Sequence, residues 1–124
     1  MARKTFQLNE RETGTYSFTL MDENKLPVSA GQLTGATLTL YEPDSGSIVN
    51  SRSGQNVLNL NNVTIDAAGL VKWSIQLADV TLLDAAKSHE IHRALFFFSW
   101  SAGGDAKGKP HEVDLQLENL GKLP

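Results

Sequence analysis

Four stretches of the chain alternate apolar and polar residues almost without interruption, and this period of two constrains the fold more than any other feature. Successive side chains of a β-strand point to opposite faces, so each stretch predicts a strand with one apolar face. Four such faces in one small domain must be buried against a second sheet. The sequence therefore predicts an all-β sandwich. The alternating apolar residues are Tyr16, Phe18 and Leu20; Ala36, Leu38 and Leu40; Val71, Trp73, Ile75 and Leu77; and Val113, Leu115 and Leu117.

The turn signals between these stretches predict about seven to nine short antiparallel strands. The most apolar segment, residues 90–101, is expected to be the central strand. Residues 78–86 break the alternation and predict one short helical crossover between the sheets. Residues 102–110 contain Gly, Lys and Pro and are expected to form a flexible polar loop before the last strand, at about 111–119.

A length of 124 residues is typical of a single domain. We assign residues 14–120 to the β-sandwich and residues 121–124 to a C-terminal tail. Residues 1–13 are polar and mixed in charge, and they are expected to form an N-terminal arm or an edge strand. Phe6 and Leu8 are the only sizeable apolar side chains of this segment.

The composition argues against several classes of protein. The chain has no cysteine, so it can form no disulfide, thiolate metal site or cysteine nucleophile. A net charge of -3 argues against a nucleic-acid-binding protein, which needs a basic face. The basic start is not followed by the apolar segment of a signal peptide. The longest apolar run, 94–98, is far shorter than the roughly 20 residues of a membrane span.

No catalytic, cofactor-binding or metal site is predicted. No serine stands in the G-x-S-x-G context of a nucleophile elbow. His89 and His92 are three residues apart on an expected strand, so they point to opposite faces and cannot share one metal ion. Residues 22–24 offer oxygen ligands but lack the residue order of a calcium loop. We therefore expect that the chain is not an enzyme and needs no cofactor.

The central strand carries apolar residues on both of its faces. Leu95 and Phe97 fall on the outer face, where exposed apolar side chains lower solubility unless something covers them. Two interpretations remain open: another part of the same chain packs over them, or they form a subunit interface. The residues assigned to the core face are Ala94, Phe96, Phe98 and Trp100.

The outward rows of the early strands carry no charge, although free edges and faces of sheets are normally protected by charge. The rows reflect either the high β-propensity of threonine or an adhesive contact face. The last expected strand differs, because its outer face is acidic and should resist stray pairing. The uncharged outward residues are Thr15, Ser17, Thr19, Thr37, Thr39 and Ser74.

Three segments resemble structural proteins of tailed bacteriophages: residues 20–28 (LMDENKLPV), 33–40 (LTGATLTL) and 69–75 (GLVKWSI). They are similar to the immunoglobulin-like domain at the N-terminus of upper baseplate proteins and in small stand-alone head and tail proteins. The resemblance covers about residues 14–118 and implies an immunoglobulin-like β-sandwich without catalytic residues. Baseplate proteins of this type continue into receptor-binding regions, whereas this chain ends at residue 124, which favours a subunit present in symmetric copies.

The leading hypothesis is a non-enzymatic structural protein of a tailed bacteriophage virion, made in the host cytoplasm. It would be an adaptor subunit of the tail, baseplate or neck, or a decoration subunit of the capsid. Its partners would be other virion proteins and copies of itself, with no nucleic acid or membrane. The predicted partner interface consists of Phe6, Leu8, Leu95 and Phe97.

Two alternatives come from other classes. A carbohydrate-binding module that adsorbs to a host surface glycan would need exposed aromatic rings, which only Tyr41, Phe97 and one of the two tryptophans could supply. Trp73 and Trp100 both fall on expected core faces, which counts against this hypothesis. A hydrolase would need His89 or His92 within hydrogen-bond reach of Asp84 and a serine, which the strand geometry disfavours.

Overall fold

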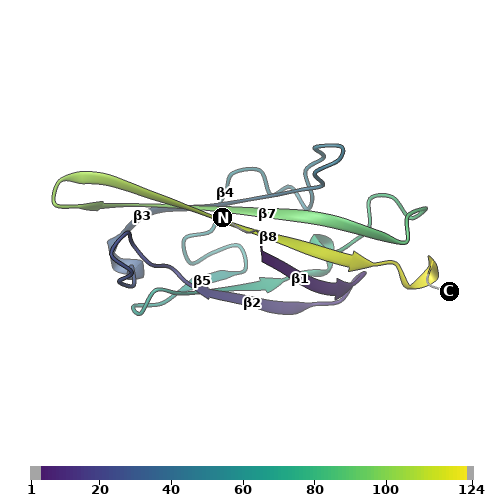
Figure 1. Ribbon diagram of the computed structural model, residues 1–124, viewed down its shortest axis with the longest axis horizontal. Helices are drawn as coiled ribbons and strands as arrows, with labels where there is room; N and C mark the ends of the chain where they lie inside the picture. The colour runs from purple at the N-terminus through teal and green to yellow at the C-terminus, as the bar shows by residue number, and fades with distance from the viewer. Residues whose placement is uncertain (1–3, 123–124) are drawn as a thin grey trace.

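The alternating stretches form the strands of two β-sheets that face each other (Figure 1). The computed structural model describes residues 4–122. One sheet has five strands in the order β1-β8-β7-β3-β4, and the other has three in the order β2-β6-β5. The strands are β1 (Lys4–Asn9), β2 (Gly14–Thr19), β3 (Leu33–Tyr41), β4 (Gln55–Asn56), β5 (Val63–Ile65), β6 (Leu70–Ile75), β7 (His89–Ala102) and β8 (Asp105–Glu118).

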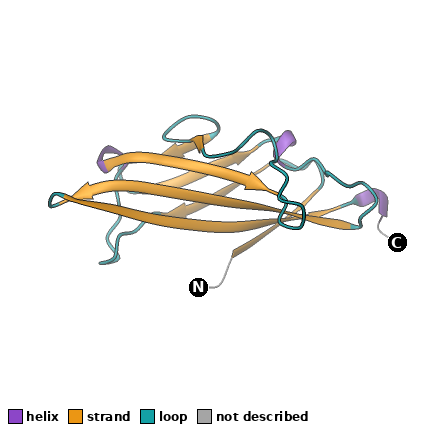
Figure 2. Cartoon of the chain, turned by 90° about the horizontal axis from the view of Figure 1, so that it is seen from above, coloured by secondary structure: helices purple, strands orange, loops and turns teal. Residues whose placement is uncertain are grey.

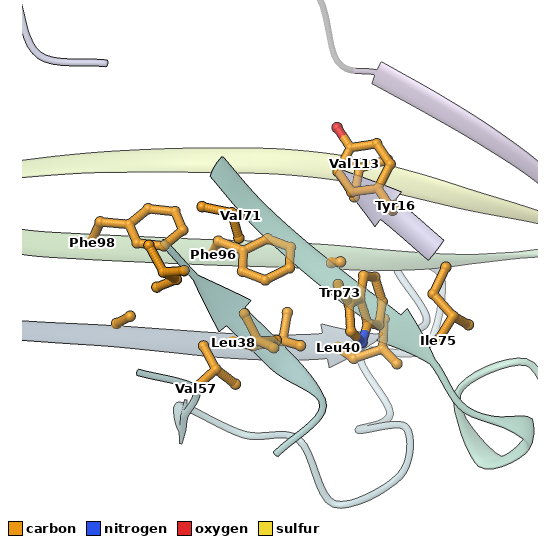
Figure 3. Packing of buried hydrophobic residues seen from close by; sticks show 14 of the residues in the cluster. Tyr16, Leu38, Leu40, Val57, Val71, Trp73, Ile75, Phe96, Phe98 and Val113 are labelled. Carbon is orange, nitrogen blue, oxygen red and sulfur yellow. The ribbon is translucent and has the colours of Figure 1, made fainter. Parts of the chain in front are cut away.

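The core lies between the two sheets and uses the predicted apolar faces (Figure 3). Trp73 of β6 packs edge-on against Phe96 of β7, with ring centroids 5.7 Å apart. Phe18 of β2 makes similar edge contacts with Phe96 and Phe98. Leu77 is the exception among the alternating residues: its side chain is 48% exposed, because β6 ends at Ile75 and Leu77 lies in a 3₁₀ turn.

The strands β7 and β8 form a long hairpin that dominates the larger sheet (Figure 2). The flexible loop predicted at 102–110 is wrong, because β8 already begins at Asp105. Ala102 pairs with Asp105, so only Gly103 and Gly104 lie in the turn, with φ of 59° and 84°. Two consecutive positive φ angles are the requirement of a type I′ hairpin turn, which two glycines meet without strain.

The first strand departs from the prediction of antiparallel pairing. β1 pairs in parallel with β8, with Phe6 opposite Leu115 and Leu8 opposite Leu117. The turn after β1 carries the chain to the other sheet instead of folding it back as a hairpin. Within this turn the Asn9 N–H donates to the Glu12 side chain at 2.8 Å.

The helical crossover predicted at 78–86 is reduced to one 3₁₀ turn, Leu77–Asp79. The rest of this segment is irregular and is held by side chains of the larger sheet. The buried Glu90 carboxylate accepts hydrogen bonds from the Leu83 and Asp84 N–H groups, both at 2.9 Å. The remaining 3₁₀ turns are Ala30–Gln32 and Leu120–Lys122. No helix within residues 4–122 has the length and hydropathy to span a membrane.

A buried arginine organises the irregular segment between β3 and β5. Arg52 is 1% exposed, and its Nε donates to Asp79 Oδ1 at 2.7 Å. The same guanidinium donates to Gln55, to the Asn61 carbonyl and to Asn62. A buried charge must be paired and hydrogen-bonded, and here one arginine satisfies both needs while tying the segment to the 3₁₀ turn.

Gly69 fixes the junction between two of the three segments that carry the resemblance, residues 20–28 and 69–75. Its φ is 80°, and a Cβ at this position would lie 2.9 Å from the Val28 carbonyl oxygen and 3.0 Å from that of Leu20. The Leu20 N–H donates to the Gly69 carbonyl at 2.8 Å. Only glycine fits both the backbone conformation and this close approach.

Candidate functional site

The structure separates the four residues predicted to contact a partner into two pairs. Leu95 and Phe97 lie on the outer face of the larger sheet, where Phe97 is 47% exposed. Phe6 and Leu8 point inward from β1. Leu8 is only 6% exposed and belongs to the core of its own chain, so its side chain is not presented to a partner. Phe6 is partly buried, with its ring centroid 5.6 Å from that of Tyr16.

Phe97 has a role in its own sheet that accounts for part of its burial. It pairs with Thr37 of β3 and with Pro110 of β8. Its ring lies over Gly108, where a Cβ would come within 2.8 Å of the Phe97 ring edge. An aromatic side chain over a glycine of the neighbouring strand covers backbone that would otherwise face water. Within residues 4–122, however, nothing covers the outer side of the ring, which stays nearly half exposed.

Leu95 and Phe97 form an apolar patch on the outer face, and a hydrogen-bonded polar group borders it. Arg93 of β7 lies opposite Tyr41 and Asp114 in the sheet. Its Nε donates to Asp114 Oδ1 at 2.8 Å. The hydrogen bond to Asp114 raises the pKa of the Arg93 guanidinium further above its usual range, against the opposing effect of burial. An apolar centre beside a satisfied polar rim is typical of a protein contact surface.

The sheet edges are a second feature that bears on interactions, because unpaired edge groups can bind another strand. The edge of β5 is closed by its own chain. The Ile65 N–H donates to Asn59 Oδ1 at 2.7 Å, and the Val63 N–H donates to the Leu60 carbonyl at 3.3 Å. Both N–H groups point away from β6, and these contacts give them the acceptors that β6 cannot provide.

The stretch of β8 that extends beyond β1 is protected in other ways. Pro110 has no N–H to offer a further strand. Lys107 forms an ion pair with Glu23 at 2.9 Å, and Lys109 Nζ donates to the Met21 carbonyl at 2.8 Å. Lysine and proline on an edge strand are the usual protection against edge-to-edge association.

The edge of β2 has neither form of protection. No strand within residues 4–122 pairs with β2 on the side away from β6. Its sequence, GTYSFT, contains no charge and no proline. Thr15, Ser17 and Thr19 are all exposed. The sequence indicated this uncharged row, but not that β2 lies at an edge.

The half-buried His111 of β8 supports β2 from the larger sheet. Its ring stacks on Phe18 with centroids 3.7 Å apart, and its Nε2 is hydrogen-bonded to the Tyr16 hydroxyl at 2.7 Å. Burial lowers the pKa of His111, and Lys4 and Lys109 add to this shift. Burial likewise raises the pKa of Tyr16. Both shifts favour the neutral forms, which pack between the sheets.

The other two histidines have structural surroundings. His92 is buried: its Nδ1 donates to the Asp79 carbonyl at 2.8 Å, and its Nε2 contacts the Glu90 carboxylate. His89 is exposed and contacts the neighbouring Ser88. Within residues 4–122, His92 contacts the Asp79 carbonyl and Glu90, and His89 contacts Ser88, so neither histidine has the Asp84 contact that the hydrolase hypothesis requires. No group of three or more histidine, aspartate or glutamate side chains in this part of the chain could hold a metal ion.

A polar hollow lies where β3 ends and β7 begins. It is lined by Glu42 and Asp44 on one side and by Lys87, His89 and Arg93 on the other. The Glu42 carboxylate accepts hydrogen bonds from the Asp44 and Ser45 N–H groups, both at 2.9 Å. Burial would raise the pKa of Glu42, but these hydrogen bonds outweigh it and hold the pKa below its usual value. The carboxylate is thus engaged by its own turn.

Neither indole offers a platform for a sugar ring. Trp73 is fully buried, and Trp100 is 5% exposed. The carbohydrate-binding hypothesis required an exposed indole beside Tyr41, so the structure does not supply its main element.

In comparisons with known proteins, no protein-family model matches the sequence, and no curated protein matches it. The outer face around Phe97 and the edge of β2 are therefore assigned as candidate interaction surfaces from their geometry alone.

Proposed function

We propose that this chain is a non-enzymatic structural subunit of a tailed bacteriophage virion that binds other virion proteins and copies of itself. It would serve as an adaptor in the tail, baseplate or neck, or as a decoration subunit of the capsid. The observation that carries the assembly role is the outward Phe97, which stays 47% exposed on the face of a five-stranded sheet. The virion assignment comes from the resemblance of residues 20–28, 33–40 and 69–75.

The strand order supports an immunoglobulin-like topology. In immunoglobulin domains one sheet contains strands G, F, C and C′ as neighbours, and the other contains B, E and D. The order β8-β7-β3-β4 and the order β2-β6-β5 correspond to these two sets, taken along the chain from B to G. β1 departs from the constant-type arrangement, because it pairs with β8, and no strand within residues 4–122 lies beside β2 on the side away from β6.

A structural role also agrees with how the buried polar side chains are used. Arg52 and Asp79 hold an irregular segment in place, and Glu90 holds another through the Leu83 and Asp84 N–H groups. These groups are hydrogen-bonded to side chains and main-chain groups of their own chain, so they stabilise loops. A subunit present in many copies needs only weak contacts at each face, because repeated contacts raise the overall affinity.

The self-interaction is tested by measuring the mass in solution by light scattering. The wild-type chain should form a defined oligomer, and Phe97→Ser should shift it towards the monomer mass of 13.5 kDa. Thr37→Lys places a charge beside Phe97 without removing its ring and should have the same effect. Leu26→Ser is the matched control, because Leu26 is 59% exposed but lies in a turn.

A wild-type monomer at all concentrations would contradict the self-interface, as would equal dissociation by Leu26→Ser. The virion assignment is tested separately by mass spectrometry of purified particles of the phage that encodes the chain. The chain should be present there in many copies per particle. Its absence from the particles would refute the assignment.

A further inference from the structure

The two edges of the smaller sheet differ in what fills their hydrogen bonds. The β5 edge is capped by Asn59 and by the Leu60 carbonyl. The β2 edge is next to no other strand within residues 4–122. In the proposed immunoglobulin-like order, the place beside β2 is the one that a further strand occupies. The vacant position is therefore shaped for a β-strand.

The hydrogen bonds of the smaller sheet identify which main-chain groups face the vacant position. The Leu20 N–H donates to Gly69, and the Ser74 N–H donates to Asn62. In the antiparallel register, Tyr16 and Phe18 therefore direct their N–H and C=O groups towards β6. The intervening residues direct theirs outward. The outward residues are Thr15, Ser17 and Thr19.

We infer that the β2 edge binds β2 of a second copy of this chain, antiparallel and about a two-fold axis at Ser17. This inference rests on the proposed assembly role and adds a contact that is separate from the Phe97 face. Ser17 is the middle of the three outward residues, so one register uses all three in both copies. Thr15 of each copy then lies opposite Thr19 of the other, and the pairing provides about six main-chain hydrogen bonds.

The side chains favour a second copy as the occupant. In this register Tyr16 and Phe18 of opposite copies become cross-strand neighbours, a favourable aromatic pair on the inner face. On the outer face only Thr and Ser meet, so no like charges oppose each other. The result is a continuous six-stranded sheet in which neither copy has an open β2 edge. Self-complementary surfaces of this kind are typical of two-fold interfaces.

Disulfide formation by an introduced cysteine reports the register of the two strands. The chain has no cysteine of its own, so any cross-link must come from the introduced residue. In a hydrogen-bonded antiparallel pair the Cα atoms are about 5.5 Å apart, within the range a disulfide requires. Ser17→Cys should therefore cross-link to itself under mild oxidation, giving a species of about twice 13.5 kDa on a non-reducing gel. In the same register the Cα atoms of the two Thr15 residues are about 14 Å apart, so these residues cannot form a disulfide.

Two further variants fix the register, and a third is the control for chance collisions. On the same gel, Thr15→Cys and Thr19→Cys should each show no disulfide-linked dimer when oxidised alone. They should cross-link to each other when the two variants are mixed. Thr64→Cys, an exposed residue of the capped β5 strand, is the control for collision and should not cross-link. All four substitutions are at exposed positions, so the fold should be retained.

The inference is overturned if Ser17→Cys forms no disulfide-linked dimer on the non-reducing gel, or if Thr64→Cys cross-links to the same extent. It is also overturned if Thr15→Cys alone cross-links more than Ser17→Cys, because the register would then be different. These failures are distinguishable from failure of the assembly role. If Phe97→Ser dissociates a wild-type oligomer while Ser17→Cys forms no disulfide, the Phe97 face stands and the β2 edge does not.

Discussion

The two edges of the three-stranded sheet have similar residue types but different surroundings. β5 (VTI) and β2 (GTYSFT) are both uncharged. At β5 the chain itself fills the outward hydrogen bonds, through Asn59 and Leu60. At β2 no other strand within residues 4–122 fills them. The difference indicates that protection of an edge in this fold depends on tertiary contacts, and that the lack of it at β2 marks a contact site.

Residues 105–112 of β8, which precede the part that pairs with β1, provide a third case of edge protection to compare with β2 and β5. Within residues 4–122, β1 pairs only with residues 113–118 of β8, and Pro110, Lys107 and Lys109 protect the stretch before them. The chain thus protects an edge with charge and proline in one place and with loop contacts in another. β2 has neither, which is unusual for an edge that stays in water.

The largest effect is expected from removing the support of the capped edge. Arg52→Met leaves Asp79 buried without its partner and releases the segment that caps β5. Breaking a buried ion pair in this way costs about 3–5 kcal/mol. The urea midpoint should fall accordingly, and the uncapped β5 edge should increase aggregation.

Arg93→Met is the matched control, because Arg93 also pairs with an aspartate but its side chain is 21% exposed. Its effect on the urea midpoint should be clearly smaller, since partly exposed ion pairs contribute less. Equal losses in the two variants would contradict the structural role assigned to Arg52.

An intermediate effect is expected from removing the cap alone. Asn59→Gly keeps the positive φ of 56° accessible but deletes the acceptor for the Ile65 N–H. We expect a loss of about 1 kcal/mol in unfolding free energy, the typical net value of one hydrogen bond. Amide exchange at Ile65 should become faster. Asn24→Gly, in an exposed turn, is the control and should leave exchange at Ile65 unchanged.

The smallest effect is expected from His111, which packs against Tyr16 and Phe18 of β2. Burial lowers the pKa of His111 from its usual 6.5, so the unfolded chain binds a proton more readily than the folded one. The stabilisation is complete above about pH 6.5 and is lost as the pH falls through the folded pKa.

The urea midpoint should therefore decrease on acidification, and His111→Gln should reduce this decrease. His89→Gln, at an exposed position, should leave the pH profile of the wild type unchanged. A His111→Gln profile identical to that of the wild type would show that His111 does not contribute.

The sequence predicted the parts of the fold that depend on local periodicity. The alternation identified the inward residues of β7, such as Phe96 and Phe98, and placed Phe97 on the opposite face. It could not predict the Arg52–Asp79 pair, because 27 residues separate the two side chains and no local pattern links them. The parallel pairing of β1 depends on the tertiary packing of Phe6 and Leu8, which the sequence left open as an arm or edge strand.

The glycines at 103–104 show why turns were harder to predict. The pair is compatible with a flexible loop and with a type I′ turn, and the long pairing of β7 with β8 selects the turn. The open edge of β2 could likewise be predicted only in part. The uncharged row could be identified from the residues, whereas strand order decides which strand ends a sheet.

The most direct test of the central claim is amide hydrogen exchange of the wild-type chain at low and high concentration. We predict that the Ile65 amide is protected in both samples. The amides of Thr15, Ser17 and Thr19 should exchange rapidly in the dilute sample and become protected in the concentrated one. Exchange at these three amides that is equally fast at both concentrations, or protected already in the dilute monomer, would contradict the claim that β2 is an open edge that a second copy fills.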